Sequence, residues 1–155
     1  MSDLESKKVI LETGAVAWWP CYIGTKQIGK GTNIGALSHI GRDATIGDNC
    51  KIQGSVYIAD KTLIGDDVFI GPGAVVTNDK YPPSQGKWQP VTICNGVVIG
   101  GNATIVAGVT LNENCVIGAG SVITKSIPKN EVWSGNPARF MMQRQEYEQR
   151  RFDNE

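Results

Sequence analysis

The sequence is poor in a residue type on which many enzymes depend. Among its 155 residues there is one histidine, His39. A single histidine excludes a zinc centre made of three imidazoles, because each ligand needs its own side chain. We therefore predict that the protein holds no metal ion.

Net charge and long apolar runs are also absent. Fifteen Lys and Arg balance fifteen Asp and Glu, so the formal charge is zero and no basic field attracts nucleic acid. No stretch is apolar and long enough to cross a bilayer. Residues 1–8 are polar and lack the apolar centre of a signal peptide. We therefore expect a cytoplasmic protein that binds neither nucleic acid nor membrane, with one domain at this length.

Cysteine is scarce and shows no CxxC spacing. The four cysteines are Cys21, Cys50, Cys94 and Cys115. Without paired spacing, neither a metal site nor a disulfide is expected. We interpret Cys50 and Cys115 as small buried apolar residues.

The sequence does contain a long repeat of six residues. Neither a helix, with a period of 3.6, nor a strand, with a period of 2, requires it, and a short period sustained over most of a chain indicates stacked coils. The repeated aliphatic positions are Ile28, Ile34, Ile40, Ile46, Ile52, Ile58, Ile64, Ile70 and Val76, and then Ile93, Ile99, Ile105, Leu111, Ile117 and Ile123.

Each unit places one large and one small side chain inward. The aliphatic residue is often followed by Gly, which suits a corner that needs positive φ or a close backbone approach. Three units make a triangular coil of eighteen residues, and its short strands pair with the coils above and below at ~4.8 Å. The sequence therefore predicts an all-β parallel helix. Ile10, Val16 and Tyr22 continue the spacing and predict one more coil at the N-terminal end.

Two segments depart from the repeat. Val76 and Ile93 are seventeen positions apart, so we predict a protruding loop at about 77–92, stiffened by three prolines. The chain also leaves the repeat near its end. We predict a β-helix domain at 1–137 and a C-terminal tail at 138–155 that contains an amphipathic helix at about 138–152.

The repeat, over about residues 10–139, resembles the hexapeptide-repeat acyltransferase family. The resemblance implies a left-handed β-helix, acetyl-CoA as co-substrate, and homotrimers with sites between subunits. Residues 68–83, VFIGPGAVVTNDKYPP, are similar to N-acetyltransferases of nucleotide-linked amino sugars, in which the "TND" or "TN" lies beside the acceptor amine. This implies catalytic roles for Asn78 and Asp79, with the loop residues Lys80, Tyr81 and Trp88 as substrate contacts.

Residues 102–139 resemble the cofactor half of CoA-dependent transferases more broadly. Small residues there, such as Ala103 and Gly108, allow a thin pantetheine arm to reach backbone amides, and basic side chains can meet phosphates. The expected cofactor contacts are Gly101, Ala107, Ala119, Lys125 and Arg139.

The loop contains no histidine, although hydroxyl acceptors need a base and O-acetyltransferases of this fold commonly carry one there. An amine is a stronger nucleophile, so we predict N-acylation of a nucleotide-linked amino sugar. His39 is the third catalytic candidate, but Ala36 replaces the first member of an "H-x-x-H" common in the group. Stacking places His39 two coils, or ~10 Å, from the row beside the loop. We therefore expect that His39 does not easily reach Asn78 in its own chain, and that a subunit interface is where it can meet the loop of a neighbour.

Three alternatives stay open or are excluded at this point. An O-acetyltransferase of serine, maltose or galactoside type becomes the better hypothesis if His39 enters the site. A non-catalytic solenoid would need no loop or groove. A γ-class carbonic anhydrase has the same fold but needs three histidines on zinc.

The aromatic residues Trp18, Trp19 and Tyr22 either cover the end of the helix or join an interface.

Overall fold

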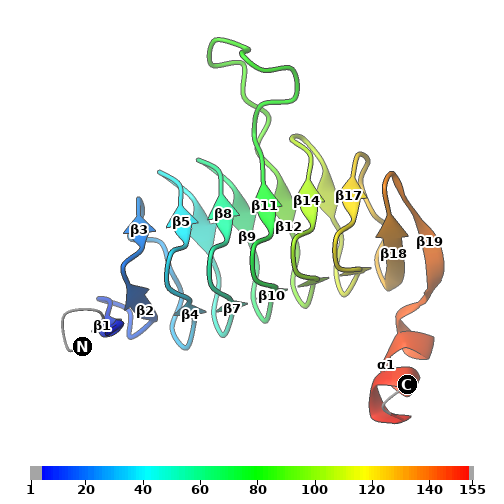
Figure 1. Ribbon diagram of the computed structural model, residues 1–155, viewed down its shortest axis with the longest axis horizontal. Coiled ribbons are helices and arrows are strands. Elements are labelled where there is room, and N and C mark those ends of the chain that lie inside the picture. Colours follow the sequence, from blue (N-terminus) through cyan, green and yellow to red (C-terminus); the bar gives the residue numbers. More distant parts are fainter. Residues whose placement is uncertain (1–4, 154–155) are drawn as a thin grey trace.

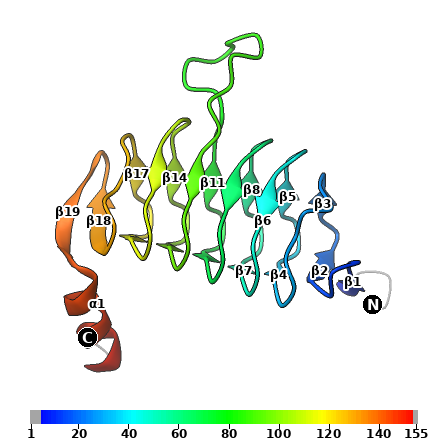
Figure 2. The ribbon, with the colours of Figure 1, turned by 180° about the vertical axis from the view of Figure 1, so that it is seen from behind.

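A computed structural model describes residues 5–153, which form a straight stack of coils with one loop projecting from its middle (Figure 1). The view from behind shows the same loop, with α1 and β1 at opposite ends of the stack (Figure 2). Three sheets form the sides. Sheet A contains β1 (Lys7–Ile10), β2 (Val16–Trp19), β4 (Asn33–Ile34), β7 (Lys51–Ile52), β10 (Phe69–Ile70), β13 (Val98–Ile99), β16 (Val116–Ile117), β18 (Glu131–Gly135) and β19 (Ala138–Gln143).

The other two sheets are built from two-residue strands that pair in parallel. Sheet B contains β3 (Tyr22–Ile23), β5 (His39–Ile40), β8 (Tyr57–Ile58), β11 (Val75–Val76), β14 (Thr104–Ile105) and β17 (Val122–Ile123). Sheet C contains β6 (Thr45–Ile46), β9 (Leu63–Ile64), β12 (Thr92–Ile93) and β15 (Thr110–Leu111). Each of the four coils from β4 to β15 contributes one strand to each sheet, and Ile28 and Ile127 extend sheet C by isolated bridges. The predicted all-β parallel helix is confirmed, and its left hand stays a prediction from the resemblance.

From β4 to β17, the second residue of each short strand points inward, and it is the residue that the repeat identifies. All fifteen repeated aliphatic side chains are at most 3% exposed. Cys50 and Cys115 are buried, as predicted, and their thiols are free in this structure. Burial raises the pKa of the Cys115 thiol to about 12, so this residue is an inert part of the core.

The corners show why Gly follows the aliphatic residue. At Gly71 the backbone is not left-handed, but an added Cβ would lie 2.5 Å from the backbone nitrogen of Gly101 in the next coil. The left-handed residue comes two positions later, at Gly73 with φ +71°. Of the two expected reasons for Gly, close backbone approach is therefore the one that applies at this position.

The N-terminal coil differs from the predicted register. Ala17 lies opposite Ile34, and Ile23 lies opposite Ile40, each seventeen positions along the chain. The inward residues are thus displaced by one from Val16 and Tyr22. Ile10 is 61% exposed on β1, which pairs antiparallel with β2. The prediction that Ile10, Val16 and Tyr22 continue the inward row was wrong.

The C-terminal helix begins later than predicted. Residues 138–143 form strand β19, which pairs antiparallel with β18 at the end of sheet A, and α1 covers Arg144–Asp153. The open edge of sheet A supplies hydrogen-bond partners that a helix at 138 would leave unused. Residues 1–4 of the predicted domain and 154–155 of the predicted tail lie outside the described part.

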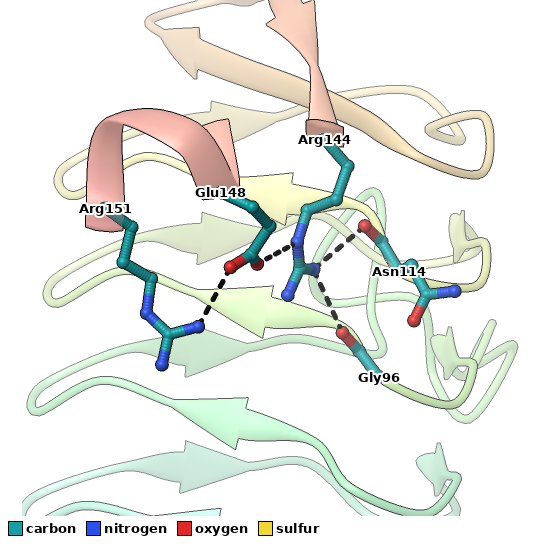
Figure 3. Close-up of polar contacts among 5 residues, drawn as sticks. All are labelled: Gly96, Asn114, Arg144, Glu148 and Arg151. Atoms are coloured by element: carbon teal, nitrogen blue, oxygen red, sulfur yellow. Dashed lines mark hydrogen bonds and ion pairs between the residues drawn. The ribbon is translucent and has the colours of Figure 1, made fainter. Parts of the chain in front are cut away.

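One arginine attaches α1 to the solenoid. Arg144 donates from Nη1 to the carbonyl oxygens of Gly96 at 3.3 Å and Asn114 at 3.0 Å, in neighbouring coils (Figure 3). Its Nε donates to Glu148 at 2.6 Å, and Glu148 also accepts from Arg151 at 2.9 Å. The hydrogen bond from Arg144 holds the pKa of Glu148 below its usual value. Since α1 has no buried residue, this cluster fixes its position.

Within residues 5–153, no helix has both the length and the apolar character needed to cross a membrane.

Candidate active site

The outward face of sheet B carries an aromatic stack. In-register parallel strands repeat the same outward position every ~4.8 Å, so Tyr22, His39 and Tyr57 lie in one column. The ring centroids of Tyr22 and His39 are 4.6 Å apart at an interplanar angle of 17°, and those of His39 and Tyr57 are 4.7 Å apart at 16°. The column then continues with Val75 and Thr104.

A second column runs along the corner between sheets B and C. Arg42 donates to Asp60 from its backbone nitrogen at 2.8 Å and from Nε at 2.9 Å, and its Nη2 lies 2.7 Å from Oδ2. Burial tends to raise the pKa of Asp60, but the hydrogen bonds from Arg42 outweigh it and lower that pKa overall. The same side-chain hydrogen bond raises the pKa of Arg42. Asn78 follows in the column and donates from Nδ2 to the carbonyl oxygen of Asp60 at 3.4 Å.

These two columns and the loop enclose a cavity of about 450 Å³. Because each strand has only two residues, the corner side chains lie close beside the outward column. His39 therefore lines one cavity with Asn78 of its own chain, and its approach to the loop of a neighbouring subunit stays a prediction. The cavity is lined by Tyr22, His39, Arg42, Tyr57, Asp60, Asn78, Asp79 and Trp88.

The loop is closed at its base and stiffened inside. The backbone nitrogen of Gln89 donates to the carbonyl oxygen of Asn78 at 2.6 Å, and the Thr77 hydroxyl donates to the carbonyl oxygen of Ile105 at 3.1 Å. Asp79 accepts from the backbone nitrogen of Ser84 at 3.0 Å through Oδ2. One carboxylate oxygen of Asp79 is thus used to hold the turn, while Oδ1 is buried without a partner among the described residues.

The predicted substrate contacts divide between two hollows. Trp88 lines the cavity with His39. Lys80 and Tyr81 instead line a separate hollow of about 400 Å³ within the loop, together with Lys87. The Lys80 ammonium lies 5.8 Å from the centre of the Tyr81 ring. The structure therefore brings Trp88, but not Lys80 and Tyr81, to the catalytic candidates.

Four of the five predicted cofactor residues flank the C-terminal half of sheet B. Continuing the register of β11, β14 and β17 by two residues places Ala107 and Lys125 after Asn78 in the corner column. Gly101 and Ala119 occupy the opposite corner, where the backbone nitrogen of Gly120 donates to the carbonyl oxygen of Gly101 at 2.8 Å. The face between these corners carries small or short side chains.

Two of the predicted cofactor residues differ from what was expected. Ala107 as a whole residue is only 1% exposed, so neither its side chain nor its backbone offers surface to a ligand. Arg139 lies on β19 in sheet A, exposed, with a single contact to the carbonyl oxygen of Ala138 at 3.5 Å. Lys125 lies 5.0 Å from the centre of the Trp133 ring.

Sequence reasoning missed four residues of the cavity, namely Tyr22, Arg42, Tyr57 and Asp60. The eighteen-residue spacing was the signal for three of them, because Tyr57 follows His39, and Asp60 follows Arg42, by one coil. Tyr22 escaped because the first coil is one residue shorter. Within residues 5–153, no group of three or more His, Cys, Asp or Glu side chains is close enough to hold a metal ion.

Comparison with known proteins gives related but mixed activities. Over 52 residues, 34% of this chain, the sequence is 52% identical to galactoside O-acetyltransferase of Escherichia coli (strain K12), and the match spans about a quarter (26%) of that relative's length. The acetyltransferase domain of PglB from Neisseria gonorrhoeae FA1090, solved in complex with acetyl coenzyme A, superposes with a TM-score of 0.73 at 21% identity, over 83% of this chain and 58% of that chain.

A second solved structure covers more of both chains. AntD, an N-acyltransferase from Bacillus cereus in complex with dTDP and 3-hydroxybutyryl-CoA, superposes with a TM-score of 0.68 at 19% identity, over 91% of this chain and 89% of that chain. At these identities the likeness to the two structures shows the fold alone. The family described as "Bacterial transferase hexapeptide (six repeats)" matches residues 25–60, 43–78 and 90–125. Since these matches cover more than half of the chain, the protein belongs to the bacterial transferase hexapeptide family.

Proposed function

We propose that this protein is an acetyl-CoA-dependent N-acetyltransferase that acts on the amine of a nucleotide-linked amino sugar. The observation that carries the proposal is the cavity in which His39, Asn78 and Asp79 meet at the base of the loop. This cavity adjoins the C-terminal half of sheet B, whose corners carry Gly101 and Ala119. Membership of the hexapeptide transferase family supports this choice. So does AntD, an N-acyltransferase of the same fold that was solved with dTDP and an acyl-CoA.

The residues of the cavity match the demands of acyl transfer to an amine. The amine nitrogen forms a bond to the thioester carbonyl carbon while the carbon–sulfur bond breaks, and the amine must lose a proton. Asn78 orients the amine through its side-chain amide, and His39 accepts the proton and returns it to the leaving thiolate. Asp79 fixes the start of the loop through Ser84, so its role is to hold Asn78 in place.

The donor side follows from the small residues. Gly101 and Ala119 leave room for a thin pantetheine arm along sheet B, and Lys125 and Arg139 serve its phosphates as charge-assisted donors. Lys80 and Tyr81, in the loop hollow, serve the nucleotide end of the acceptor. An open face of this kind becomes a groove when a second copy covers it, in keeping with a homotrimer.

A second candidate is O-acetylation of a sugar hydroxyl. The specific observation in its favour is the position of His39, because a histidine in the cavity supplies the base that a hydroxyl acceptor needs and that the loop itself lacks. The segment that is 52% identical to a galactoside O-acetyltransferase supports the same alternative.

Matched acceptors separate the two functions. Release of free thiol from acetyl-CoA is measured with dTDP- and UDP-linked amino sugars, with the same nucleotide sugars carrying a hydroxyl at that carbon, and with galactosides and maltose. Turnover on an amine, with little on its hydroxyl counterpart, is the expected result. Turnover on hydroxyl acceptors alone would replace the proposal with the second candidate. His39→Ala is expected to lower kcat/KM by about 10²-fold or more, the range of a lost general base.

A further inference from the structure

In the part of the chain that the structure describes, no polar group forms a hydrogen bond that would orient the ring of His39. The polar side chains around it bond elsewhere: Arg42 to Asp60, Asn78 to the backbone of Asp60, and Asp79 to the backbone of Ser84. Among residues 5–153 no hydrogen bond reaches either ring nitrogen. Catalytic histidines are ordinarily held by a carboxylate or a carbonyl on the second nitrogen. Something else must fix this ring if it is to transfer a proton at a defined place.

Two tyrosine rings hold it instead. Tyr22 and Tyr57 cover the two faces of the imidazole at centroid distances of 4.6 and 4.7 Å. The plane of each tyrosine ring is tilted from the imidazole plane by no more than 17°. These distances equal the spacing of paired strands, ~4.8 Å, so the three side chains stack because they leave their strands in the same direction. A ring covered on both faces cannot swing along the column. Its edge, which carries the nitrogens, is covered by neither tyrosine, and His39 lines the cavity.

In the strands of sheets B and C, outward aromatic residues other than His39 itself occur only at the two positions beside it. The next residue of the sheet B column is Val75, followed by Thr104. The outward column of sheet C runs through Thr45, Leu63, Thr92 and Thr110 without an aromatic residue. The stack therefore does not follow from the repeat itself, which fixes only the inward positions.

We propose that Tyr22 and Tyr57 are positioning residues that hold the imidazole of His39 edge-on to the cavity, where it takes the proton of the acceptor beside Asn78. This inference rests on the proposed function. The proton passes from the acceptor nitrogen to the imidazole and then to the thiolate that leaves, so no further reactant is needed. The phenol hydroxyl groups have no part in the step, and the rings alone provide the confinement.

The first test observes the ring directly. His39 is the only histidine, so in protein without a histidine tag its Hε1 and Hδ2 protons give the only imidazole resonances. Ring currents of the flanking tyrosines are expected to move them upfield from the values of free histidine. Tyr22→Leu and Tyr57→Leu should each move them back, whereas Tyr22→Phe and Tyr57→Phe should not. Resonances that do not change in the Leu variants would overturn the proposal.

The second test separates positioning from substrate contact. In Tyr22→Leu/Tyr57→Leu, kcat is expected to fall about tenfold or more, since small misplacements of a catalytic group cost up to ~10²-fold, while KM stays within about twofold. The double Phe variant should retain kcat. Phe69→Leu, at an outward position of sheet A, is the matched control for loss of a surface ring. A raised KM with unchanged kcat would overturn the positioning role.

The activity of His39→Ala distinguishes failure of the base role of His39 from failure of the positioning role of Tyr22 and Tyr57. Full activity of His39→Ala would remove the base role from the proposed function, and this proposal with it. Activity lost in His39→Ala but kept in the double Leu variant would overturn the positioning role alone. Loss in both, with rescue by Phe, is the expected pattern.

Discussion

Replacing Gly71 by Ala should force two coils apart. An ideal Cβ at Gly71 would lie 2.5 Å from the nitrogen, and 2.9 Å from the Cα, of Gly101, although ordinary carbon contacts begin near ~3.5 Å. Relief requires a shift of roughly 1 Å, because both neighbours are backbone atoms. The shift stretches the hydrogen bond from Gly71 to the carbonyl oxygen of Ile99, now 2.7 Å long. Overpacking of this kind costs about 1–3 kcal/mol, and a weakened hydrogen bond adds about 1 kcal/mol.

The matched control is Gly54→Ala, on the same edge of the triangle. There an added Cβ meets only the carbonyl oxygen of Ala36, at 3.2 Å, and φ is not left-handed. Thermal melting followed by circular dichroism, at equal protein concentration, should show a fall of about 4–16 °C for Gly71→Ala, from a loss of ~2–4 kcal/mol in a chain of this size. Gly54→Ala should stay within about 2 °C of the parent protein. Equal melting temperatures for the two variants would refute the argument from close approach.

Three further predictions concern the corners and the helix. Leu37 has φ +64° and is 68% exposed. Because Asn tolerates this left-handed conformation at little cost, Leu37→Asn should raise the melting temperature by about 2 °C. A lower melting temperature would contradict this prediction. Arg144→Met should speed hydrogen–deuterium exchange of the α1 amides. The melting temperature of the solenoid should stay within about 2 °C, because α1 buries no side chain. Unchanged protection of α1 would show that other contacts hold the helix. The pKa of Asp60 is lowered overall, because the hydrogen bonds from Arg42 outweigh the effect of burial. The ionised Asp60 carboxylate therefore stabilises the fold above the unfolded pKa of ~3.9, and this stabilisation is lost as pH falls through the lower folded pKa. Asp60→Asn should therefore flatten the acid side of the melting profile, and an identical slope in both proteins would disprove this.

The repeat predicted the solenoid because one rule recurs at every coil. Ile99 and Ile117 illustrate it: each is buried, and each lies opposite the other at a spacing of eighteen. The ends could not be predicted in this way, because there the partners on one side are missing. Ile23 takes the inward place that the spacing gave to Tyr22, and β19 forms because the edge of sheet A is open. These outcomes depend on tertiary context rather than on local pattern.

The candidate site was predicted in its parts but not in its assembly. The loop, Asn78, Asp79 and Trp88 were identified from residue types and resemblance, and they do lie in one cavity with His39. Counting coils did not predict that His39 and Asn78 line one cavity, because a count along the stack ignores how far side chains extend sideways. The pair Arg42 and Asp60 is recognisable only when the residues are written in rows of eighteen.

The loop interrupts the count without disturbing the stack. Asp66 and Asn95 occupy equivalent corners and bond to each other at 2.8 Å although 29 positions separate them, against 18 for Arg42 and Asp60. Each coil is aligned by its neighbours and not by the length of chain that reaches it. The corner between β11 and β12, from which the loop projects, can therefore accept segments of other lengths and compositions. Exchanging these segments offers a route to new acceptor preferences on an unchanged scaffold.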